Sequence, residues 1–325
     1  MLQIGIIGAG VVAARHADAY RRHPRCELVA IAEPDALRGQ AFATTYGATW
    51  YPDYRDMLSN SRLDAASICV PHHLHHPVAL ATAEAGLHML MEKPISLTLA
   101  EADQMIAACQ RCGVRIMLGF VHRFRGELLE AERLIVAGAI GRPATAQDSI
   151  CTLGGSHPPA WVWEQAHAGG GVLMYGGIHS VDRLLWLLQS NVVEVFAYQT
   201  RYASPGNVEN GLAAVLRFGD GVIATLFENS PPYGKPGGWI TEIYGTEGAI
   251  RIKTGEWIEL TTGEQSYTQN FTRYDHFRRE IDEFVASLLE DRPPSVTAED
   301  GRRALAVARA IYDSAASGQP RSVGE

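Results

Sequence analysis

The sequence lacks the usual marks of nucleic-acid-binding, membrane-spanning and secreted proteins. It has no run of basic residues and a formal net charge of −8, so it offers no positive patch for nucleic acid. Every long apolar stretch contains glycine, histidine or a charge, which argues against a transmembrane span. The amino-terminal segment MLQIGIIG has no basic part and becomes glycine-rich at once, unlike a signal peptide.

Cysteines are few, and no metal-binding pattern is complete. The odd number of five cysteines, without regular spacing, indicates a reducing compartment, and we expect a cytoplasmic protein. Cys109 and Cys112 have CxxC spacing, but they fall at the end of an expected helix and no second pair exists. Four histidines lie between residues 72 and 76, and no Asp, Glu or Cys stands among them. We therefore expect no metal site.

What is present is enough chain for two domains, with 325 residues of which 46% are hydrophobic. Five short apolar runs alternate with helical segments, which predicts a doubly wound parallel sheet of the Rossmann type, an α/β domain, over residues 1–122. The expected strands are 2–7, 28–32, 65–70, 88–91 and 115–121.

The second part of the chain, residues 123–325, has a different pattern. After a helix at 126–137, several strands are joined by turns of a few residues, which is typical of a largely antiparallel sheet. These strands are expected at 143–151, 192–202, 212–219, 222–230, 240–245, 248–253 and 256–261. A capped helix to residue 317 makes this an α+β domain.

A glycine-rich turn follows the first expected strand. Gly8, Gly10 and Ala13 form the pattern G-x-G-x-x-A between a strand and a helix, where it binds dinucleotide phosphates. Glu33 ends the second strand, where an acidic residue accepts hydrogen bonds from ribose hydroxyls and repels a 2′-phosphate. We therefore expect NAD. NADP is the alternative, since Arg38 would soften this preference, and helix capping is the alternative role of Glu33.

Two charges, Glu92 and Lys93, follow a short buried strand. Ligands bind at this carboxyl edge in open α/β sheets. Pro94 keeps Lys93 extended, and Thr98 with Glu101 opens the next helix as a capping box. Taken alone, the pattern fits a surface ion pair beside a turn equally well.

A second group of candidate residues surrounds the glycine-rich segment that begins at Gly169. Tyr175, His179 and Asp182 have the spacing of one helix face, and a glycine-rich helix start with a structural histidine is the alternative. Trp161 and Trp163 lie just upstream and are candidate walls of a ligand site, although a core or hinge role fits them equally well.

Together these motifs resemble the Gfo/Idh/MocA family of NAD(P)-dependent oxidoreductases over essentially the whole chain. The resemblance is carried by Gly8-x-Gly10-x-x-Ala13, Pro71-x-x-Leu74-His75, Glu92-Lys93-Pro94, Gly119-Phe-Val-His-Arg123-Phe124, Gly169-Gly-Gly…His179-x-x-Asp182 and Glu299-Asp300-Gly301-Arg302. It implies a Rossmann domain followed by an open antiparallel sheet, whose exposed face forms homodimers or homotetramers. It also implies that Lys93 sits between nicotinamide and substrate.

The sequence departs from this family at one position. Many members have an Asp four residues before the histidine, where this chain has Tyr175. Asp182 does not replace it, because the family has an Asp there as well. We predict hydride transfer between nicotinamide and a sugar, polyol or cyclitol, with His179 as the base and Lys93 stabilising negative charge. Tyr175 would orient His179 or the substrate.

These expectations define two residue sets and leave two other function classes open. The expected cofactor-binding residues are Gly8, Gly10, Val11, Val12, Glu33, Arg38, Pro71, His72, His75, Glu92, Lys93 and His122. The expected substrate-binding residues are Lys93, His122, Trp161, Trp163, Tyr175 and His179. The alternatives are a glycosidase that uses NAD for transient oxidation and a catalytically silent cofactor-sensing regulator. Retention of Lys93 and His179 argues against the regulator.

Overall fold

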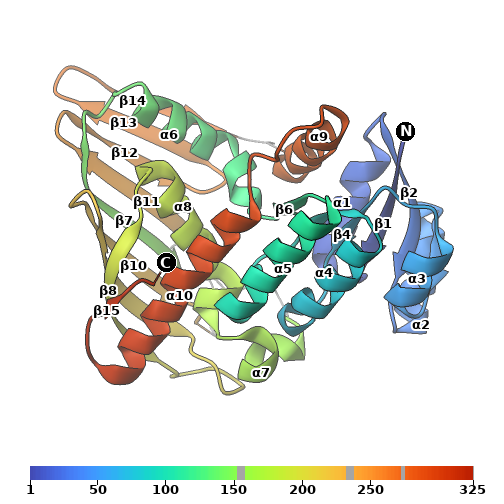
Figure 1. Ribbon diagram of the computed structural model, residues 1–325. Coiled ribbons are helices and arrows are strands. Elements are labelled where there is room, and N and C mark those ends of the chain that lie inside the picture. The colour runs from blue at the N-terminus through green and yellow to red at the C-terminus, as the bar shows by residue number, and fades with distance from the viewer. Residues whose placement is uncertain (152–157, 232–237, 272–274, 325) are drawn as a thin grey trace. The chain divides into compact units, whose positions relative to one another are not determined.

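The computed structural model describes residues 1–151, 158–231, 238–271 and 275–324, which form two compact units (Figure 1). The first unit comprises residues 1–121 and 275–302, and the second comprises residues 122–274 and 303–325. The expected division into 1–122 and 123–325 differs from this one, because the chain returns to the first unit near its end.

The first unit is built on a six-stranded parallel sheet with the strand order β3-β2-β1-β4-β5-β6, which confirms the predicted doubly wound fold. Its strands are β1 (Leu2–Ile7), β2 (Cys26–Ala32), β3 (Thr49–Tyr51), β4 (Ala65–Ile68), β5 (His88–Met91) and β6 (Ile116–Leu118). Its helices are α1 (Val11–Arg21), α2 (Ala36–Tyr46), α3 (Tyr54–Asn60), α4 (His75–Glu84), α5 (Leu99–Cys112) and α9 (His276–Leu289), with the short turn η1 (His72–Leu74). The strand β3 has only three residues and was not predicted.

The parallel register brings the carboxyl ends of the central strands together. Ile7 at the end of β1 pairs with Ala32 of β2 and with Ile68 of β4, and Ile68 pairs with Met91 of β5. The residues that follow these strands therefore leave the sheet at one edge. Beyond β5, the predicted capping box of α5 is confirmed.

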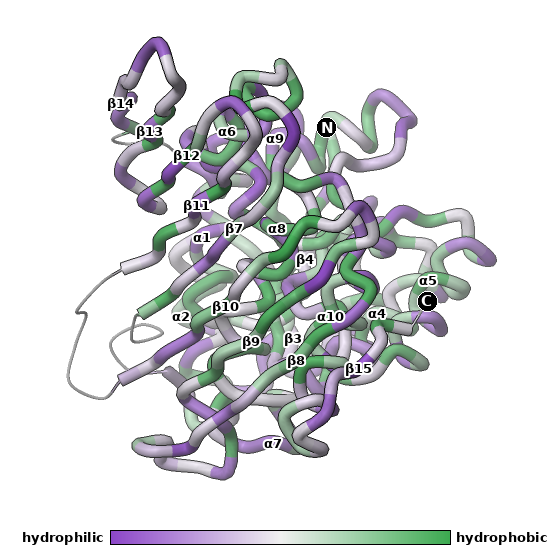
Figure 2. Tube along the Cα trace, turned by 90° about the vertical axis from the view of Figure 1, so that its left-hand side faces the viewer, coloured by the Kyte–Doolittle hydropathy of each residue, from purple (hydrophilic) through white to green (hydrophobic). Residues whose placement is uncertain are grey.

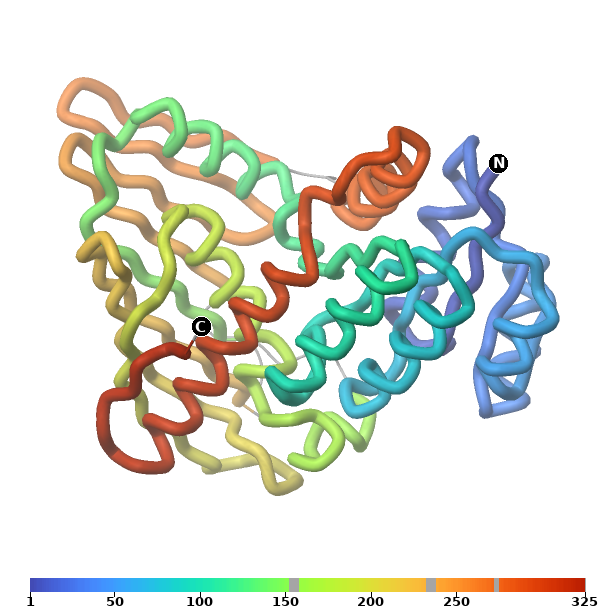
Figure 3. The backbone as a smooth tube through the Cα atoms, in the orientation of Figure 1, coloured from blue at the N-terminus to red at the C-terminus, as the bar shows by residue number. Residues whose placement is uncertain are grey.

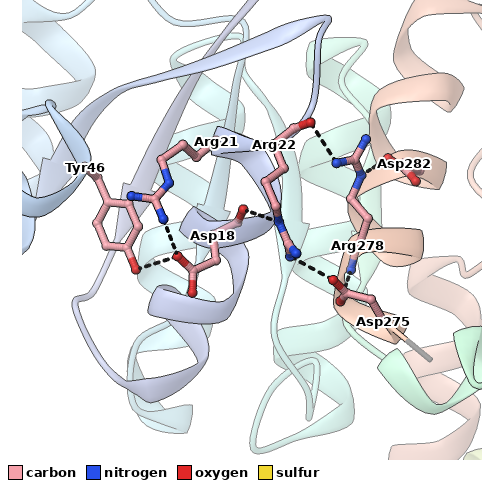
Figure 4. Close-up of polar contacts among 7 residues, drawn as sticks. All are labelled: Asp18, Arg21, Arg22, Tyr46, Asp275, Arg278 and Asp282. Atoms are coloured by element: carbon pink, nitrogen blue, oxygen red, sulfur yellow. Dashed lines mark hydrogen bonds and ion pairs between the residues drawn. The ribbon is translucent and has the colours of Figure 1, made fainter. Parts of the chain in front are cut away.

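Helix α9 packs on α1, although more than two hundred residues separate them in the sequence. Figure 4 shows the polar contacts of this packing: the Arg22 guanidinium donates to Asp275 at 2.8 Å, and Arg278 donates to the carbonyl of Arg22 at 2.8 Å. Asp275 also caps α9 through the backbone N–H of Arg278. Ile281, Phe284 and Val285 of α9 are buried, whereas these polar contacts are exposed.

The second unit contains a nine-stranded, mostly antiparallel sheet with the order β14-β13-β12-β11-β7-β10-β9-β8-β15, as predicted for this part of the chain. Its strands are β7 (Pro143–Cys151), β8 (Val192–Thr200), β9 (Gly211–Phe218), β10 (Ile223–Asn229), β11 (Gly238–Gly245), β12 (Gly248–Lys253), β13 (Trp257–Thr262), β14 (Ser266–Asn270) and β15 (Arg321–Ser322). Figure 3 traces β12 to β14 as consecutive hairpins at one end of this sheet. The pair β7–β10 is parallel.

Helices α6 (Gly126–Val136) and α8 (Ile178–Leu188) pack against this sheet. The remaining elements are η2 (Val121–Phe124), η3 (Ala160–Trp163), α7 (Gln165–Ala168), η4 (Leu173–Gly177) and α10 (Ala298–Ser317). Within the described ranges, no helix is both long and apolar enough to cross a bilayer.

Candidate functional site

The turn after β1 forms a cradle for an anion at the first turn of α1. Gly8 has φ +98°, and a Cβ there would lie 2.4 Å from the carbonyl oxygen of Cys69, so a larger residue would be both strained and blocked. A Cβ at Gly10 would meet nothing within 4 Å, and Gly10 caps α1 without a side-chain bond. The first turn of α1 therefore begins beside open space, next to the exposed Val11, and this geometry fits a pyrophosphate.

Glu33, predicted to bind the ribose, is buried beside this turn and already has protein partners. Its carboxylate accepts hydrogen bonds from the backbone N–H of Ala9 at 2.9 Å and of Asp35 at 3.0 Å. The Arg38 guanidinium donates to the same carboxylate at 2.6 Å. Arg38 is half-exposed, so the binding of a ribose by Glu33 depends on the position that the Arg38 guanidinium takes beside this carboxylate.

The segment after β5 places Lys93 at the same sheet edge. The Lys93–Pro94 peptide is cis. His75, predicted to contact the cofactor, is fully buried, and its Nδ1 lies 2.6 Å from the carbonyl oxygen of Pro94. Burial lowers the pKa of His75, so the ring is neutral and holds this loop. Burial also lowers the pKa of Lys93, and the neighbouring Glu92 opposes that shift.

Beneath this loop lies a buried cluster that sequence reasoning did not find. His16 Nε2 lies 3.6 Å from Glu92 and 3.4 Å from Glu280 of α9, and His16 Nδ1 lies 3.6 Å from the Cys69 thiol. Burial opposes protonation of His16, but Cys69 and the two glutamates outweigh it and raise its pKa. Burial raises the pKa of Glu280 to about 7. The contacts with His16 outweigh burial at Glu92 and lower the pKa of that carboxyl.

This cluster makes stability depend on pH. In the folded state the pKa values of both His16 and Glu280 lie above their usual values of 6.5 and 4.5, so folding favours bound protons near neutrality. The cluster's contribution is therefore present at lower pH and is lost as the pH rises from about 4.5 through 7 and beyond. We expect the Tm to fall between about pH 6 and 8, and the fall to be smaller in Glu280→Gln.

Glu283→Gln, on the same helix, is the matched control for this calorimetric comparison. The Arg292 contacts outweigh burial and lower the pKa of Glu283, so its stabilising contribution is lost only at acid pH. Glu283→Gln should show the same fall of Tm with pH across neutrality as the wild type. If the Tm of Glu280→Gln also falls as steeply as that of the wild type, Glu280 is not responsible for this pH dependence.

The second unit stacks two histidines that lie far apart in the sequence. The rings of His122, at η2, and His179, in α8, are nearly parallel, with centroids 4.2 Å apart and an interplanar angle of 12°. Trp239 of β11 meets the His122 ring edge-on at 4.5 Å. Both histidines are buried. The prediction had placed His122 at the cofactor and the substrate and did not foresee this stack.

Tyr175 lies on the π-helical turn η4 rather than on the regular helix that the i, i+4, i+7 spacing suggested. Asp182 on α8 is bound by Arg123, whose Nε donates at 3.0 and 3.2 Å, so this carboxylate is occupied by an ion pair. Tyr175 and Trp163 line a largely apolar cleft with about 410 Å³ of space, counted out to its open mouth. Trp161 is not part of the described lining.

Glu209 explains the glycine run before Tyr175. It is buried, and its carboxylate accepts hydrogen bonds from the backbone N–H of Gly171 at 2.6 Å and of Leu173 at 3.1 Å. Tyr312 of α10 donates to the same carboxylate at 2.8 Å. A Cβ at Gly171 would lie 1.8 Å from the carbonyl oxygen of Glu209, so the glycine is needed for this close approach.

The cysteines and histidines flagged in the sequence show no metal-binding arrangement in the described part of the chain. No group of three or more His, Cys, Asp or Glu side chains there is placed to hold an ion. Cys109 is a free thiol in α5, and burial raises its pKa to about 11. His72 is buried after β4, with its ring 5.6 Å from that of His75.

Two family models match the chain. One, described as an oxidoreductase family with an NAD-binding Rossmann fold, matches residues 2–120. The other, described as the C-terminal alpha/beta domain of the same oxidoreductase family, matches residues 132–323. Together they account for both units.

Curated relatives and solved structures agree with these matches. The 1,5-anhydro-D-fructose reductase of Ensifer adhaerens is 28% identical over 98% of each chain. The myo-inositol 2-dehydrogenase of Thermotoga maritima is 28% identical over 94% of this chain and 93% of its own. An aldose-aldose oxidoreductase of Caulobacter crescentus, solved with glycerol, superposes with a TM-score of 0.89 over 99% of each chain at 26% identity.

Proposed function

Because the chain belongs to the Gfo/Idh/MocA oxidoreductase family, with its NAD-binding Rossmann domain, we propose that it transfers a hydride between NAD and the CH–OH carbon of a sugar, polyol or cyclitol. The observation that carries this proposal is the sheet edge where the Gly8–Gly10 cradle, Glu33 and Lys93 follow paired strand ends. The names of the reductase and the inositol dehydrogenase among the relatives support the substrate class.

The residues divide the chemistry between binding and proton transfer. The glycine turn, Glu33 and Arg38 would hold the dinucleotide, whose nicotinamide accepts or donates the hydride when bound. His179 takes the hydroxyl proton of the alcohol as a general base. Lys93 binds the substrate oxygen and stabilises its negative charge as the proton leaves. Tyr175 and Trp163 contact the substrate from the apolar cleft.

A substrate panel tests this proposal directly. Purified protein is mixed with NAD and, in turn, with aldoses, polyols, inositols and anhydro sugars, and the absorbance of NADH is followed. We expect at least one of these compounds to give sustained NADH formation. The reverse panel, with keto sugars and NADH, covers the reductive direction. Absence of turnover in both directions would overturn the proposal.

Cofactor preference gives a further prediction. We propose that NAD binds more tightly than NADP, because the buried Glu33 carboxylate would repel a 2′-phosphate. Glu33→Ser should lower the ratio of the Kd of NADP to the Kd of NAD. Arg38→Ala should raise this ratio, since the half-exposed guanidinium is the group available to a 2′-phosphate. Calorimetric titration of both dinucleotides measures the ratio, and tighter NADP binding by the wild type would contradict the prediction.

The uncovered face of the nine-stranded sheet predicts self-association. Tyr198, Ala213 and Phe227 form a cross-strand row on β8, β9 and β10, and the two aromatic rings are 63% and 52% exposed. Figure 2 shows the apolar segments of β9 and β10 in this sheet. Val215 and Ile223 extend the patch, and exposed patches of this kind are typical of protein interfaces.

We propose that this face forms a homodimer or homotetramer. Light scattering should give at least twice the chain mass of 35.4 kDa. Phe227→Glu should reduce the measured mass, whereas Thr261→Glu on the outlying strand β13 should leave it unchanged. A monomeric wild type would refute the proposal.

A further inference from the structure

Arg183 is a fully buried arginine on the same helix as His179, one turn further along. Buried arginines are uncommon unless their donors are matched. Here one terminal nitrogen, Nη1, donates to Asp148 at 3.1 Å and to the hydroxyl of Thr241. The other, Nη2, lies 2.8 Å from Nδ1 of His122.

The contact with His122 fixes a proton position. A guanidinium has only N–H donors and no acceptor, so the His122 nitrogen that faces it must be the acceptor. The ring proton of a neutral His122 is therefore on Nε2. Protonation at Nδ1 would remove this hydrogen bond and place a second cation beside Arg183 in a buried site.

The surroundings hold the guanidinium in place. Asp148 of β7 is buried and also accepts hydrogen bonds from Trp239 at 2.7 Å and from Thr241 at 2.6 Å. The Arg183 guanidinium lies over the Trp239 ring, 4.7 Å from its centroid. Asp148 is the carboxylate that pairs with Arg183, with both side chains fully buried, and burial together with the negative charge of Asp148 raises the pKa of the nearby Glu228.

The stacked rings of His122 and His179 connect the Arg183 hydrogen bonds to His179, the proposed general base. His179 lies parallel to His122 at 4.2 Å, so any rotation of the His122 ring disturbs the surface on which His179 rests. We propose that Arg183 is a positioning residue: it fixes the tautomer and ring plane of His122 and, through the stack, the orientation of His179. This inference rests on the proposed function of His179 as the base.

Arg183→Met tests both parts of this proposal. Nitrogen NMR of the imidazole rings should show His122 as the single Nε2–H tautomer in the wild type. The variant should lose this signature, because Nδ1 no longer has an obligate donor opposite it. The kcat should fall by about ten- to a hundred-fold, the cost of a misoriented catalytic group, while the Kd of NAD stays unchanged.

Arg133→Met is the control, because Arg133 is an arginine of the same unit, on α6, and pairs with Glu130 at 2.7 Å. It should keep both the His122 signature and the kcat. If Arg183→Met does not fold, Arg183→Lys carries the test. Lysine has a single terminal nitrogen and cannot serve Asp148 and His122 with separate groups.

The proposal requires both changes in the Arg183 variant. An unchanged His122 signature, or a kcat within about two-fold of the wild type, overturns it. Failure of the proposed function is a separate result: the wild type would then turn over none of the panel, while the NMR comparison would still show whether Arg183 fixes the His122 tautomer.

Discussion

Lys93→Ala is expected to lower kcat by about a hundred- to a thousand-fold or more while the Kd of NAD changes little. The lysine charge is needed chiefly when negative charge develops on the substrate oxygen, so its loss acts on the transition state rather than on cofactor binding. Glu92, whose pKa is lowered by the contacts with His16, supplies the neighbouring negative charge that favours the charged form of Lys93.

The measurement is steady-state kinetics on the best substrate of the panel, with calorimetric titration of NAD. Lys253→Ala is the matched control, because this lysine ends strand β12 and pairs with Glu256 at 2.9 Å. It should retain the wild-type kcat. Full activity in Lys93→Ala would refute the functional assignment as a whole.

His179→Ala is expected to lower kcat by about a hundred- to ten-thousand-fold, the usual contribution of a general base. The loss should be largest near neutral pH, where an imidazole is suited to accept the proton. At higher pH the activity that remains should rise, because the substrate hydroxyl needs less help from the protein to lose its proton.

A pH profile of kcat for the wild type and the variant measures this difference. His76→Ala serves as the control, since His76 Nε2 contacts Gln104 in the first unit at 2.8 Å. That variant should follow the wild-type profile. A uniform loss across the profile would assign His179 a binding role rather than a proton-transfer role.

Local patterns were sufficient to predict the parallel sheet and its edge. Gly8 indicates the turn because few other residues tolerate its φ of +98°, and the Thr98–Glu101 capping box is a pattern within one helical turn. The ends of the strands were predicted less accurately, because β4 and β6 are shorter than the apolar runs from which they were predicted. Apolar residues continue beyond the last paired residue in both.

The residues that the prediction missed owe their roles to distant partners. Glu280 lies on the buried face of α9, where a charged residue conceals the apolar pattern of Ile281, Phe284 and Val285. A search for an Asp N-cap before that pattern would have found the helix. Arg183 gave no such signal, because arginines are usually exposed and its partner Asp148 lies on strand β7, 35 residues earlier in the chain.

The return of residues 275–302 to the first unit has a consequence for biosynthesis. A ribosome must make residues 122–274 before α9 emerges, which takes roughly ten to thirty seconds at typical rates of chain elongation. During that interval α1 has no α9 to pack on, and Glu280 is not there to face His16. The nucleotide-binding unit, although its sheet is synthesised first, is completed only near the end of translation.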